Sequence, residues 1–344
     1  MGSDLTIKIN QIKNKLIDFK KKYSLKYIIF TLGNTRVLNS RNYYFTPFRK
    51  GNDFILCGAI VFSETEGEII LKALDGIVDI FYVDCEKKSI KYEHNNGLYN
   101  LERLSQEIIV NSKLRYYKGN DLTVNTIDSL VVNILKKKNK LVGGSNILIV
   151  GLGNLGFKTS LRLVERGAHV FVLSSDLDKG KLLSKSINIV KPKETISKVK
   201  IFNNININKL DVIILCHLSS IEKYSDIYFN TNKDCSFIDV GKGCLTKNQI
   251  SFLNNRNNYC LRLDIGDTIL DYIINDMKYA FKNFQLPKTK KINNISLISK
   301  GLIGKKGEIV VDDVDNPKFI YGICDGFGGL QKVDDENKIL SKIL

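Results

Sequence analysis

The 344-residue chain has few of the residues on which metal chemistry depends. It contains no tryptophan, four prolines and three histidines: His94, His169 and His217. Three scattered histidines are too few for a histidine-rich metal centre, which gathers several imidazoles around one ion. We therefore expect no metal site.

Long apolar runs and paired cysteines are missing as well. No apolar run reaches the ~20 residues that a transmembrane helix needs, and the N-terminus lacks the apolar segment of a signal peptide. The seven cysteines never form C-x-x-C, and their odd number indicates free thiols in a reducing compartment. The sequence thus predicts a soluble, cytoplasmic protein without a membrane partner.

The chain is strongly basic, with a formal net charge of +16. Such a charge is common in nucleic-acid-binding proteins, but there the basic residues form a recognisable patch or motif. Here the lysines are spread along the chain, in a composition rich in Lys, Asn and Ile that an AT-rich genome would produce. We expect no nucleic-acid partner, and a small anionic substrate fits the charge.

The most informative stretch is residues 145–176. An apolar run of strand length at 146–150 leads into Gly-Leu-Gly-Asn-Leu-Gly at 151–156, then into a helical pattern and a second strand at 170–173. The turn matches G-x-G-x-x-G in the strand–turn–helix context that makes this motif meaningful. It predicts a dinucleotide-binding domain; the alternative is a domain of the same shape that binds another nucleotide or nothing.

Each glycine of this turn meets a different physical requirement. Gly151 permits the tight turn, Gly153 lets the backbone approach a pyrophosphate, and Gly156 lets the helix lie close to the strand. The following helix offers free N–H groups and a partial positive charge to phosphates. The predicted pyrophosphate-binding residues are Gly151, Gly153, Asn154, Leu155 and Gly156.

The end of the second strand bears on the choice of cofactor. NAD enzymes commonly hold the ribose hydroxyls with Asp or Glu there. By register this position is Ser174, followed by Ser175 and Asp176. A serine does not repel a 2′-phosphate, and Lys179 and Lys181 follow closely. We therefore favour NADP and keep NAD open, because Asp176 could turn back onto the ribose.

Strands alternate with helices on both sides of the glycine turn, which predicts an α/β fold with two lobes. We place an N-terminal α/β domain for substrate or assembly at residues 1–121. A Rossmann domain at 122–285 is entered by a linking helix at 122–140. Residues 286–344 form a β-rich C-terminal tail, which we expect to pack on the first domain.

Two local patterns in the first domain are informative. Ser63-Glu64-Thr65-Glu66 is a capping box that predicts a helix start. The stretch 34–53 mixes Arg36, Arg41, Arg49 and Lys50 with aromatic residues. This stretch is either an anion-binding lip, because arginine can donate two parallel hydrogen bonds to a carboxylate, or a solvated loop with aromatic anchors. We favour the solvated loop.

Five motifs follow one another between residues 120 and 267: VNTIDSLVVNILKKK, ILIVGLGNLG, LDVIILCHLSS, FIDVGKGCLTKNQISFL and LRLDIGD. In these motifs the chain resembles the D-2-hydroxyacid dehydrogenases of the formate/glycerate dehydrogenase-like group. The resemblance covers less than half of the chain, and it extends to amino-acid and shikimate-type dehydrogenases.

The resemblance implies roles for residues at the strand ends. Lys242 stands where the family has its substrate-binding arginine, and Asp267 where an acid orients the catalytic histidine. Asp264 would hold the nicotinamide carboxamide. The further cofactor-binding residues that the resemblance implies are Cys216, Val240 and Gly241.

The chain departs from the family in important places. No histidine follows His217, so the catalytic histidine of the family is missing. Lys242 replaces an arginine, the long dimerisation arm is absent, and the tail matches no known pattern. His217 is the one histidine near the predicted cofactor edge, where it either relays a proton or lines the adenosine side. The candidate catalytic residues are Lys242, Asp267 and His217.

The sequence therefore predicts an NAD(P)-dependent oxidoreductase acting on a small anionic hydroxy, keto, amino or imino acid between two lobes. We expect the chain to form a homo-oligomer, specifically a homodimer. Two other classes stay open: a non-catalytic dinucleotide-binding protein for regulation or assembly, and a lyase or cyclase with tightly bound NAD.

Overall fold

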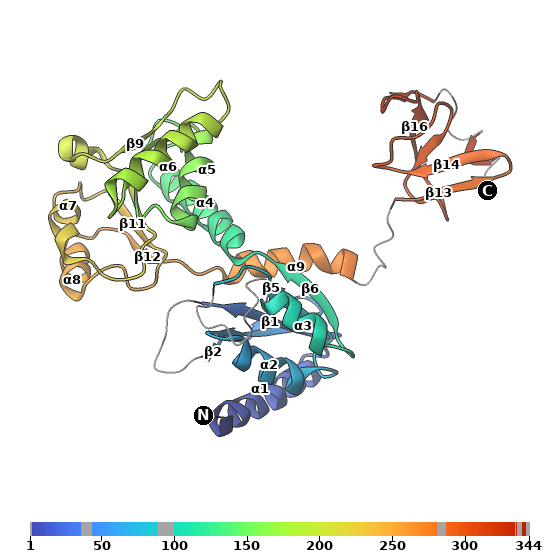
Figure 1. The fold of residues 1–344 in the computed structure, drawn as a ribbon, viewed down its shortest axis with the longest axis horizontal. Coiled ribbons are helices and arrows are strands. Elements are labelled where there is room, and N and C mark those ends of the chain that lie inside the picture. The colour runs from blue at the N-terminus through green and yellow to red at the C-terminus, as the bar shows by residue number, and fades with distance from the viewer. Residues whose placement is uncertain are drawn as a thin grey trace. The chain divides into compact units, whose positions relative to one another are not determined.

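The computed structural model describes residues 2–35, 43–88, 100–280, 287–333, 335 and 339–341. The chain divides into two compact units, Met1–Asn275 and Asp276–Leu344. The first unit contains two sheets built mainly from parallel strands, and the second contains a smaller, mostly antiparallel sheet (Figure 1). The predicted α/β class with a β-rich tail is confirmed.

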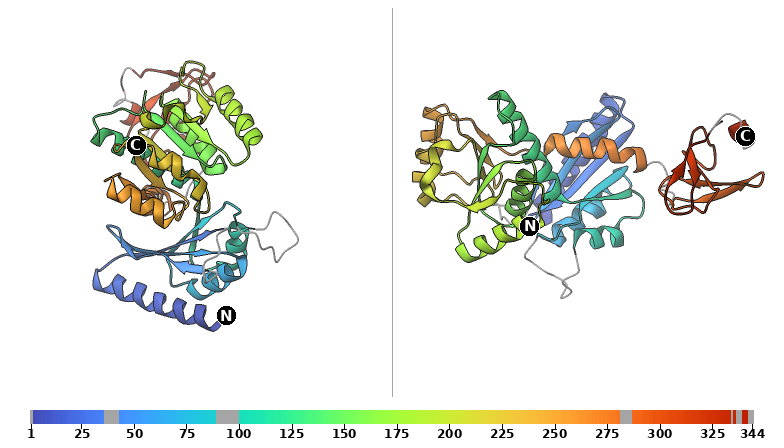
Figure 2. Two further views of the ribbon diagram at one scale, coloured as in Figure 1. Left: turned by 90° about the vertical axis from the view of Figure 1, so that its left-hand side faces the viewer. Right: turned by 90° about the horizontal axis from the view of Figure 1, so that it is seen from above.

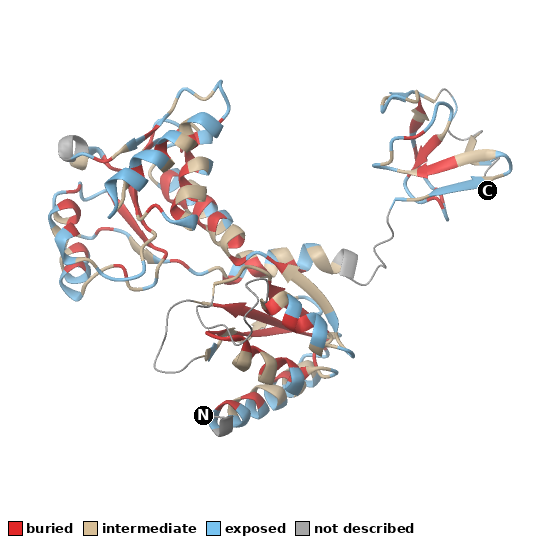
Figure 3. Ribbon diagram, viewed as in Figure 1, coloured by how far each residue is buried: buried red, intermediate tan, exposed pale blue. Residues whose placement is uncertain are grey.

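The first sheet has the strand order β2-β4-β1-β5-β6, and β3 also pairs with β4. Its strands are β1 (Tyr27–Asn34), β2 (Tyr43–Phe45), β3 (Arg49–Lys50), β4 (Phe54–Val61), β5 (Ile80–Asp84) and β6 (Lys113–Tyr117). The four long strands run parallel, while β2 and β3 are antiparallel to β4. The central strands are buried almost throughout, as parallel strands covered by helices are (Figure 3).

Helices α1 (Gly2–Lys22), α2 (Glu64–Leu74) and α3 (Leu101–Ile108) pack on this sheet. Helix α1 lies along the sheet (Figure 2) and buries Leu5, Ile9 and Leu16. Helix α2 starts at the predicted capping box, in which the Ser63 backbone N–H donates to the Glu66 carboxylate over 3.2 Å.

The second sheet consists of six parallel strands in the order β12-β11-β10-β7-β8-β9. They are β7 (Asn146–Val150), β8 (His169–Leu173), β9 (Val199–Ile201), β10 (Val212–Leu215), β11 (Ser236–Asp239) and β12 (Cys260–Arg262). Counted from β7 this is the order 3-2-1-4-5-6 of a Rossmann sheet. Strand β12 is shorter than its apolar pattern suggests, because Asp264 accepts the Gly266 N–H and begins the next helix.

Helices cover both faces of the second sheet. They are α4 (Gly119–Lys137), α5 (Asn154–Glu165), α6 (Leu177–Val190), α7 (Ser225–Phe229) and α8 (Lys247–Asn255), with 3₁₀ turns η1 (Asn204–Lys209) and η2 (Glu222–Tyr224). Side chains of β7 alternate between two cores, with Ile147 and Ile149 in one and Leu148 and Val150 in the other. This alternation explains why the strand is apolar throughout.

Helices α4 and α9 (Gly266–Ala280) connect the two sheets of the first unit. The Thr126 hydroxyl of α4 donates to the Thr268 hydroxyl of α9 over 2.8 Å. The Tyr272 hydroxyl of α9 donates to the Tyr116 carbonyl of β6 over 2.7 Å. Helix α9 thus carries the chain from the Rossmann sheet back to the first sheet.

The C-terminal unit is a five-stranded sheet in the order β13-β14-β15-β16-β17. Its strands are β13 (Thr289–Ile292), β14 (Ile295–Ser299), β15 (Ile309–Val311), β16 (Ile320–Cys324) and β17 (Leu330–Gln331). Only β14 and β15 pair in parallel. Leu297, Val311 and Ile320 are buried in its own small core. Within the described ranges, no helix is both long and apolar enough to cross a membrane.

Candidate functional site

The glycine turn lies where the strand order of the Rossmann sheet reverses, between β7 and β10. Gly151 follows β7 with a φ of +97°, in the left-handed region that favours glycine. A Cβ there would lie 3.0 Å from both the Cys216 carbonyl carbon and the His217 nitrogen at the end of β10. Ligands of open α/β sheets bind in the crevice at this reversal.

The other two glycines of the turn differ in their surroundings. A Cβ on Gly156 would lie 2.0 Å from the Gly151 carbonyl oxygen, whereas a Cβ on Gly153 would meet no atom within 4 Å. The space beside Gly153 is open, and the first turn of α5 leaves backbone N–H groups without intrahelical acceptors. Open space next to unpaired N–H groups fits a pyrophosphate.

The end of β8 carries the predicted cofactor-selecting residues. The Asp176 carboxylate accepts the Lys179 N–H over 3.0 Å and is the N-cap of α6. Ser174 is half-buried against Gly180, where an added Cβ would lie 3.0 Å from the Ser174 Cβ, and Ser175 is exposed. Asp176 therefore has a structural role already, and Ser174 occupies the strand-end position.

Cys216 and His217 follow β10. Burial raises the pKa of the Cys216 thiol to about 12, so this group stays a neutral thiol. His217 Nδ1 is hydrogen-bonded to the Ser219 carbonyl oxygen, which can only accept, so Nδ1 carries the proton. Nε2 is then an acceptor, buried and without a hydrogen-bond partner in the part of the chain that the structure describes. Burial lowers the pKa of His217, against the opposing effects of the Ser219 bond and Asp239.

The end of β11 packs tightly against the end of β10. The Val240 N–H donates to the Leu215 carbonyl over 3.0 Å. A Cβ on Gly241 would lie 1.9 Å from the His217 carbonyl oxygen. Position 241 must therefore be glycine, and the backbone at His217 is held by its neighbouring strand.

Lys242 forms the tip of the loop after β11. The Asp239 carboxylate holds this loop by accepting the Gly243 N–H over 2.8 Å and the Cys244 N–H over 3.3 Å. Lys242 has a φ of +59°, which is unfavourable for a residue with a side chain. Its ammonium group is exposed and has no hydrogen bond or ion pair with any described residue.

The end of β12 brings Asp264 and Arg49 together. The Asp264 carboxylate accepts the Gly266 N–H over 2.9 Å. Both of its oxygens lie 3.4 Å from Nη2 of Arg49, which belongs to β3 of the first sheet. Asp267 is exposed in the first turn of α9, where a carboxylate stabilises the helix N-terminus.

Two contacting residues were not among the predicted site residues, although Arg49 belonged to the anion-binding lip that we did not favour. Arg49 is 21% exposed, so it is not the solvated side chain that we favoured, while Arg36 and Arg41 lie outside the described residues. The Asn120 amide at the start of α4 donates to the Asn154 side chain over 3.2 Å. Neither contact has a sequence signal, because its partners are far apart along the chain.

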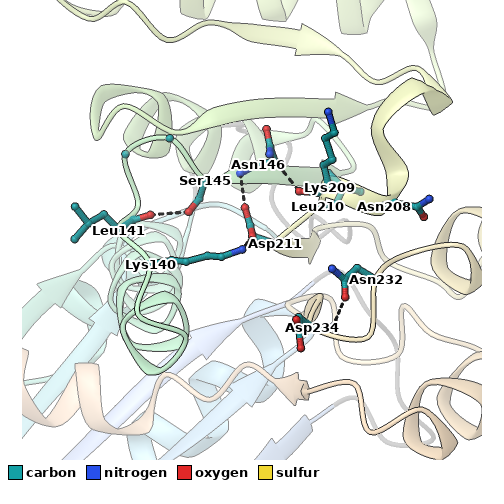
Figure 4. Close-up of a pocket in the computed structure, with 12 residues that line it drawn as sticks. Lys140, Leu141, Ser145, Asn146, Asn208, Lys209, Leu210, Asp211, Asn232 and Asp234 are labelled. Carbon is teal, nitrogen blue, oxygen red and sulfur yellow. Dashed lines mark hydrogen bonds and ion pairs between the residues drawn. The ribbon is translucent and has the colours of Figure 1, made fainter.

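A separate cavity of about 540 Å³ opens at the opposite, amino edge of the Rossmann sheet (Figure 4). Its Asp211 carboxylate accepts the Asn146 N–H over 2.8 Å and the Lys140 ammonium over 2.5 Å. These charges are paired within the chain and tie the starts of β7 and β10 to the loop after α4. Among the residues described, no group of three His, Cys, Asp or Glu side chains is arranged to hold a metal ion.

Comparison with protein-family models gives no match, and neither does comparison with curated proteins. Among solved structures, the chain aligns with a dipicolinate synthase polypeptide from Bacillus halodurans at 16% identity and a TM-score of 0.32, over 64% of this chain and 72% of that one. It aligns with L-tryptophan dehydrogenase from Nostoc punctiforme at 13% identity and a TM-score of 0.38, over 66% and 65%.

It also aligns with an NAD complex of a D-isomer-specific 2-hydroxyacid dehydrogenase from Lactobacillus delbrueckii, at 9% identity and a TM-score of 0.31, over 59% and 63%. At these scores the likenesses carry no weight for this chain. Its fold and candidate site rest on the strand order and contacts described above.

Proposed function

We propose that the protein is an NAD(P)-dependent oxidoreductase for a small anionic hydroxy, keto, amino or imino acid. One observation carries this proposal. The G-x-G-x-x-G turn lies at the reversal of a 3-2-1-4-5-6 parallel sheet, with open space beside Gly153. That combination is the arrangement by which Rossmann domains hold dinucleotides.

A bound nicotinamide dinucleotide would donate or accept the hydride. In this proposal the backbone N–H groups of Asn154 and Leu155 hold its pyrophosphate beside Gly153. Ser174 faces the ribose and tolerates a 2′-phosphate, which favours NADP and leaves NAD possible. Asp264, at the nicotinamide half of the sheet, accepts from the carboxamide.

The substrate would lie against the ends of β10, β11 and β12. Lys242 supplies a free positive charge for a carboxylate or for charge developing on a carbonyl oxygen. Neutral His217 can accept a proton from a substrate hydroxyl at Nε2 once binding uncovers this atom, which is buried in the structure. The unfavourable backbone at Lys242 supports a functional role, because strained residues persist where function requires them. Asp267 completes the set of polar groups at these strand ends.

We also propose the division of the chain into three domains, at residues 1–121, 122–285 and 286–344.

The test begins with fluorescence titration of the full chain with NADPH and NADH. Turnover is then followed by absorbance of the reduced cofactor, with a panel of 2-hydroxy, 2-oxo and amino acids. Saturable binding with turnover supports the proposal. Binding without turnover would favour a non-catalytic protein, and NAD retained through purification without release of NADH would favour a lyase or cyclase. Failure to bind either cofactor would overturn the proposal.

A further inference from the structure

Arg49 occupies an unusual position for a residue of a two-residue edge strand. Its guanidinium lies directly on the backbone at the start of α9. A Cβ on Gly266 would lie 2.3 Å from its Nη2 and 2.5 Å from its Nε. Its side chain is only 21% exposed. The first sheet thus presents a largely buried cation to the carboxyl edge of the Rossmann sheet.

This half-buried cation is weakly held. Nη2 lies 3.4 Å from each Asp264 oxygen, and Nη1 lies 3.5 Å from the Pro47 carbonyl. Charge-assisted hydrogen bonds are ordinarily about 2.7–2.9 Å long. The Asp264 carboxylate is itself 77% exposed. A half-buried guanidinium whose contacts with the described residues are all long has unused capacity to donate hydrogen bonds.

The two cations at these neighbouring strand ends, Lys242 and Arg49, differ in chemistry. Lys242, after β11, is a flexible point charge, whereas a guanidinium presents a rigid fork that matches both oxygens of a carboxylate. Arg49, which belongs to β3 of the first sheet, lies against the residues that follow β12, the strand next to β11. The pair therefore offers one group for two-point carboxylate recognition and another for the oxygen that reacts.

We propose that Arg49 recognises the carboxylate of the substrate and that Asp264 holds it in place until the substrate arrives. The ligand takes the place of the Asp264 oxygens on the guanidinium, and Asp264 is released towards the cofactor. This inference rests on the proposed function for the identity of the ligand as an organic acid. It assigns the recognition of that acid to the first lobe.

The probe is oxalate, a small dicarboxylate, titrated calorimetrically into the full chain both alone and with saturating NADP or NAD. Arg49→Met should weaken oxalate binding about tenfold to hundredfold, the range for a lost charge-assisted bond. The oxalate affinity of Arg49→Lys should lie between those of the wild type and Arg49→Met, because lysine keeps the charge but cannot donate two parallel hydrogen bonds to a carboxylate. Arg103→Met removes an exposed arginine paired with Glu107 on α3 and should bind oxalate like the wild type.

The Asp264→Asn variant distinguishes recognition of a carboxylate ligand by Arg49 from a purely structural ion pair between Arg49 and Asp264. Asparagine can still accept the Gly266 N–H but no longer competes for Arg49 as an anion, so oxalate affinity should rise several-fold. A purely structural pair would give unchanged or weaker binding in this variant. That result would overturn the inference, as would wild-type oxalate affinity in Arg49→Met or no oxalate binding by the wild type. Dinucleotide affinity of the wild type, measured separately, decides the proposed function.

Discussion

The carbonyl oxygen of Gly151 lies 2.0 Å from the position that a Cβ on Gly156 would take. Helix α5 can therefore begin against the end of β7 only because residue 156 is glycine. Gly153, between them, meets nothing within 4 Å of its own Cβ position. One motif thus contains glycines required by the fold and a glycine whose space is open to a ligand.

Gly153→Val should leave the fold intact and abolish dinucleotide binding. Gly153 has an ordinary extended backbone, with φ of −85° and ψ of −159°, so the new side chain brings no strain. It would fill the space that we assign to the pyrophosphate. Fluorescence titration with NADPH and NADH measures the loss, and circular dichroism checks the fold. Cofactor affinity equal to that of the wild type would remove the Rossmann site from the proposal.

Gly156→Ala is the matched structural variant. Its Cβ would overlap a backbone oxygen that cannot move without displacing β7, so we expect destabilisation of about 3 kcal/mol or more. Urea unfolding followed by circular dichroism measures the change. Full stability in this variant would mean that α5 and β7 are packed less closely than the structure has them.

Ser174→Asp should shift cofactor preference from NADP to NAD. A carboxylate at the end of β8 would repel a 2′-phosphate and accept from ribose hydroxyls. The ratio of the two dissociation constants should change by about tenfold or more, as expected for a like-charge contact. Ser186→Asp adds the same charge farther along α6 and should leave the ratio unchanged. An unaltered ratio in Ser174→Asp would show that another residue faces the ribose.

Two substitutions at Lys242 distinguish its charge from its backbone. Lys242→Met keeps the unfavourable φ of +59°, and Lys242→Gly removes both the strain and the side chain. Lys242→Met should leave the free energy of unfolding within about 0.5 kcal/mol, as is usual for exposed positions, whereas Lys242→Gly should raise it by about 1 kcal/mol because the positive φ no longer opposes a side chain. Both should raise KM for the acid; kcat should fall too if the ammonium stabilises charge in the transition state. Wild-type values of both constants would exclude Lys242 from the site.

His217 should determine the acid limb of the pH profile. Burial lowers its pKa below the usual 6.5, so the imidazole is neutral at pH 7 and loses its free Nε2 acceptor only at lower pH. We expect the rate of oxidation to fall with a midpoint below 6.5. His217→Asn should remove this limb and reduce kcat about 100-fold, as for loss of a general base. His169→Asn, at the amino end of β8, should keep the limb.

The lowered pKa of His217 also makes the free energy of unfolding depend on pH. A depressed folded-state pKa means that the unfolded chain binds the proton more readily. The stability contributed by neutral His217 is therefore fully present above pH 6.5 and is lost as the pH falls below that value. Chemical unfolding of the wild type and His217→Asn across this range should show a smaller pH dependence in the variant. Equal slopes would place His217 in a solvated setting.

Local chemistry made much of the fold predictable from the sequence. The glycine turn, the capping box at Ser63 and the apolar strands around Val150 depend on residues within a few positions of one another. Such patterns act through backbone conformation and side-chain periodicity, which neighbouring residues determine. The Rossmann unit and the β-rich tail were accordingly predictable before any tertiary contact was known.

The tertiary structure decided which polar groups are already engaged. Asp176 could have faced a ribose by its place in the chain, but it caps α6. Arg49 resembled a solvated loop residue, but it lies against Asp264, 215 positions away. The sequence determined that a strand–glycine turn–helix unit exists, because that unit is local. Only folding decided which cation meets which carboxylate, because contacts between distant segments depend on how the sheets and helices pack.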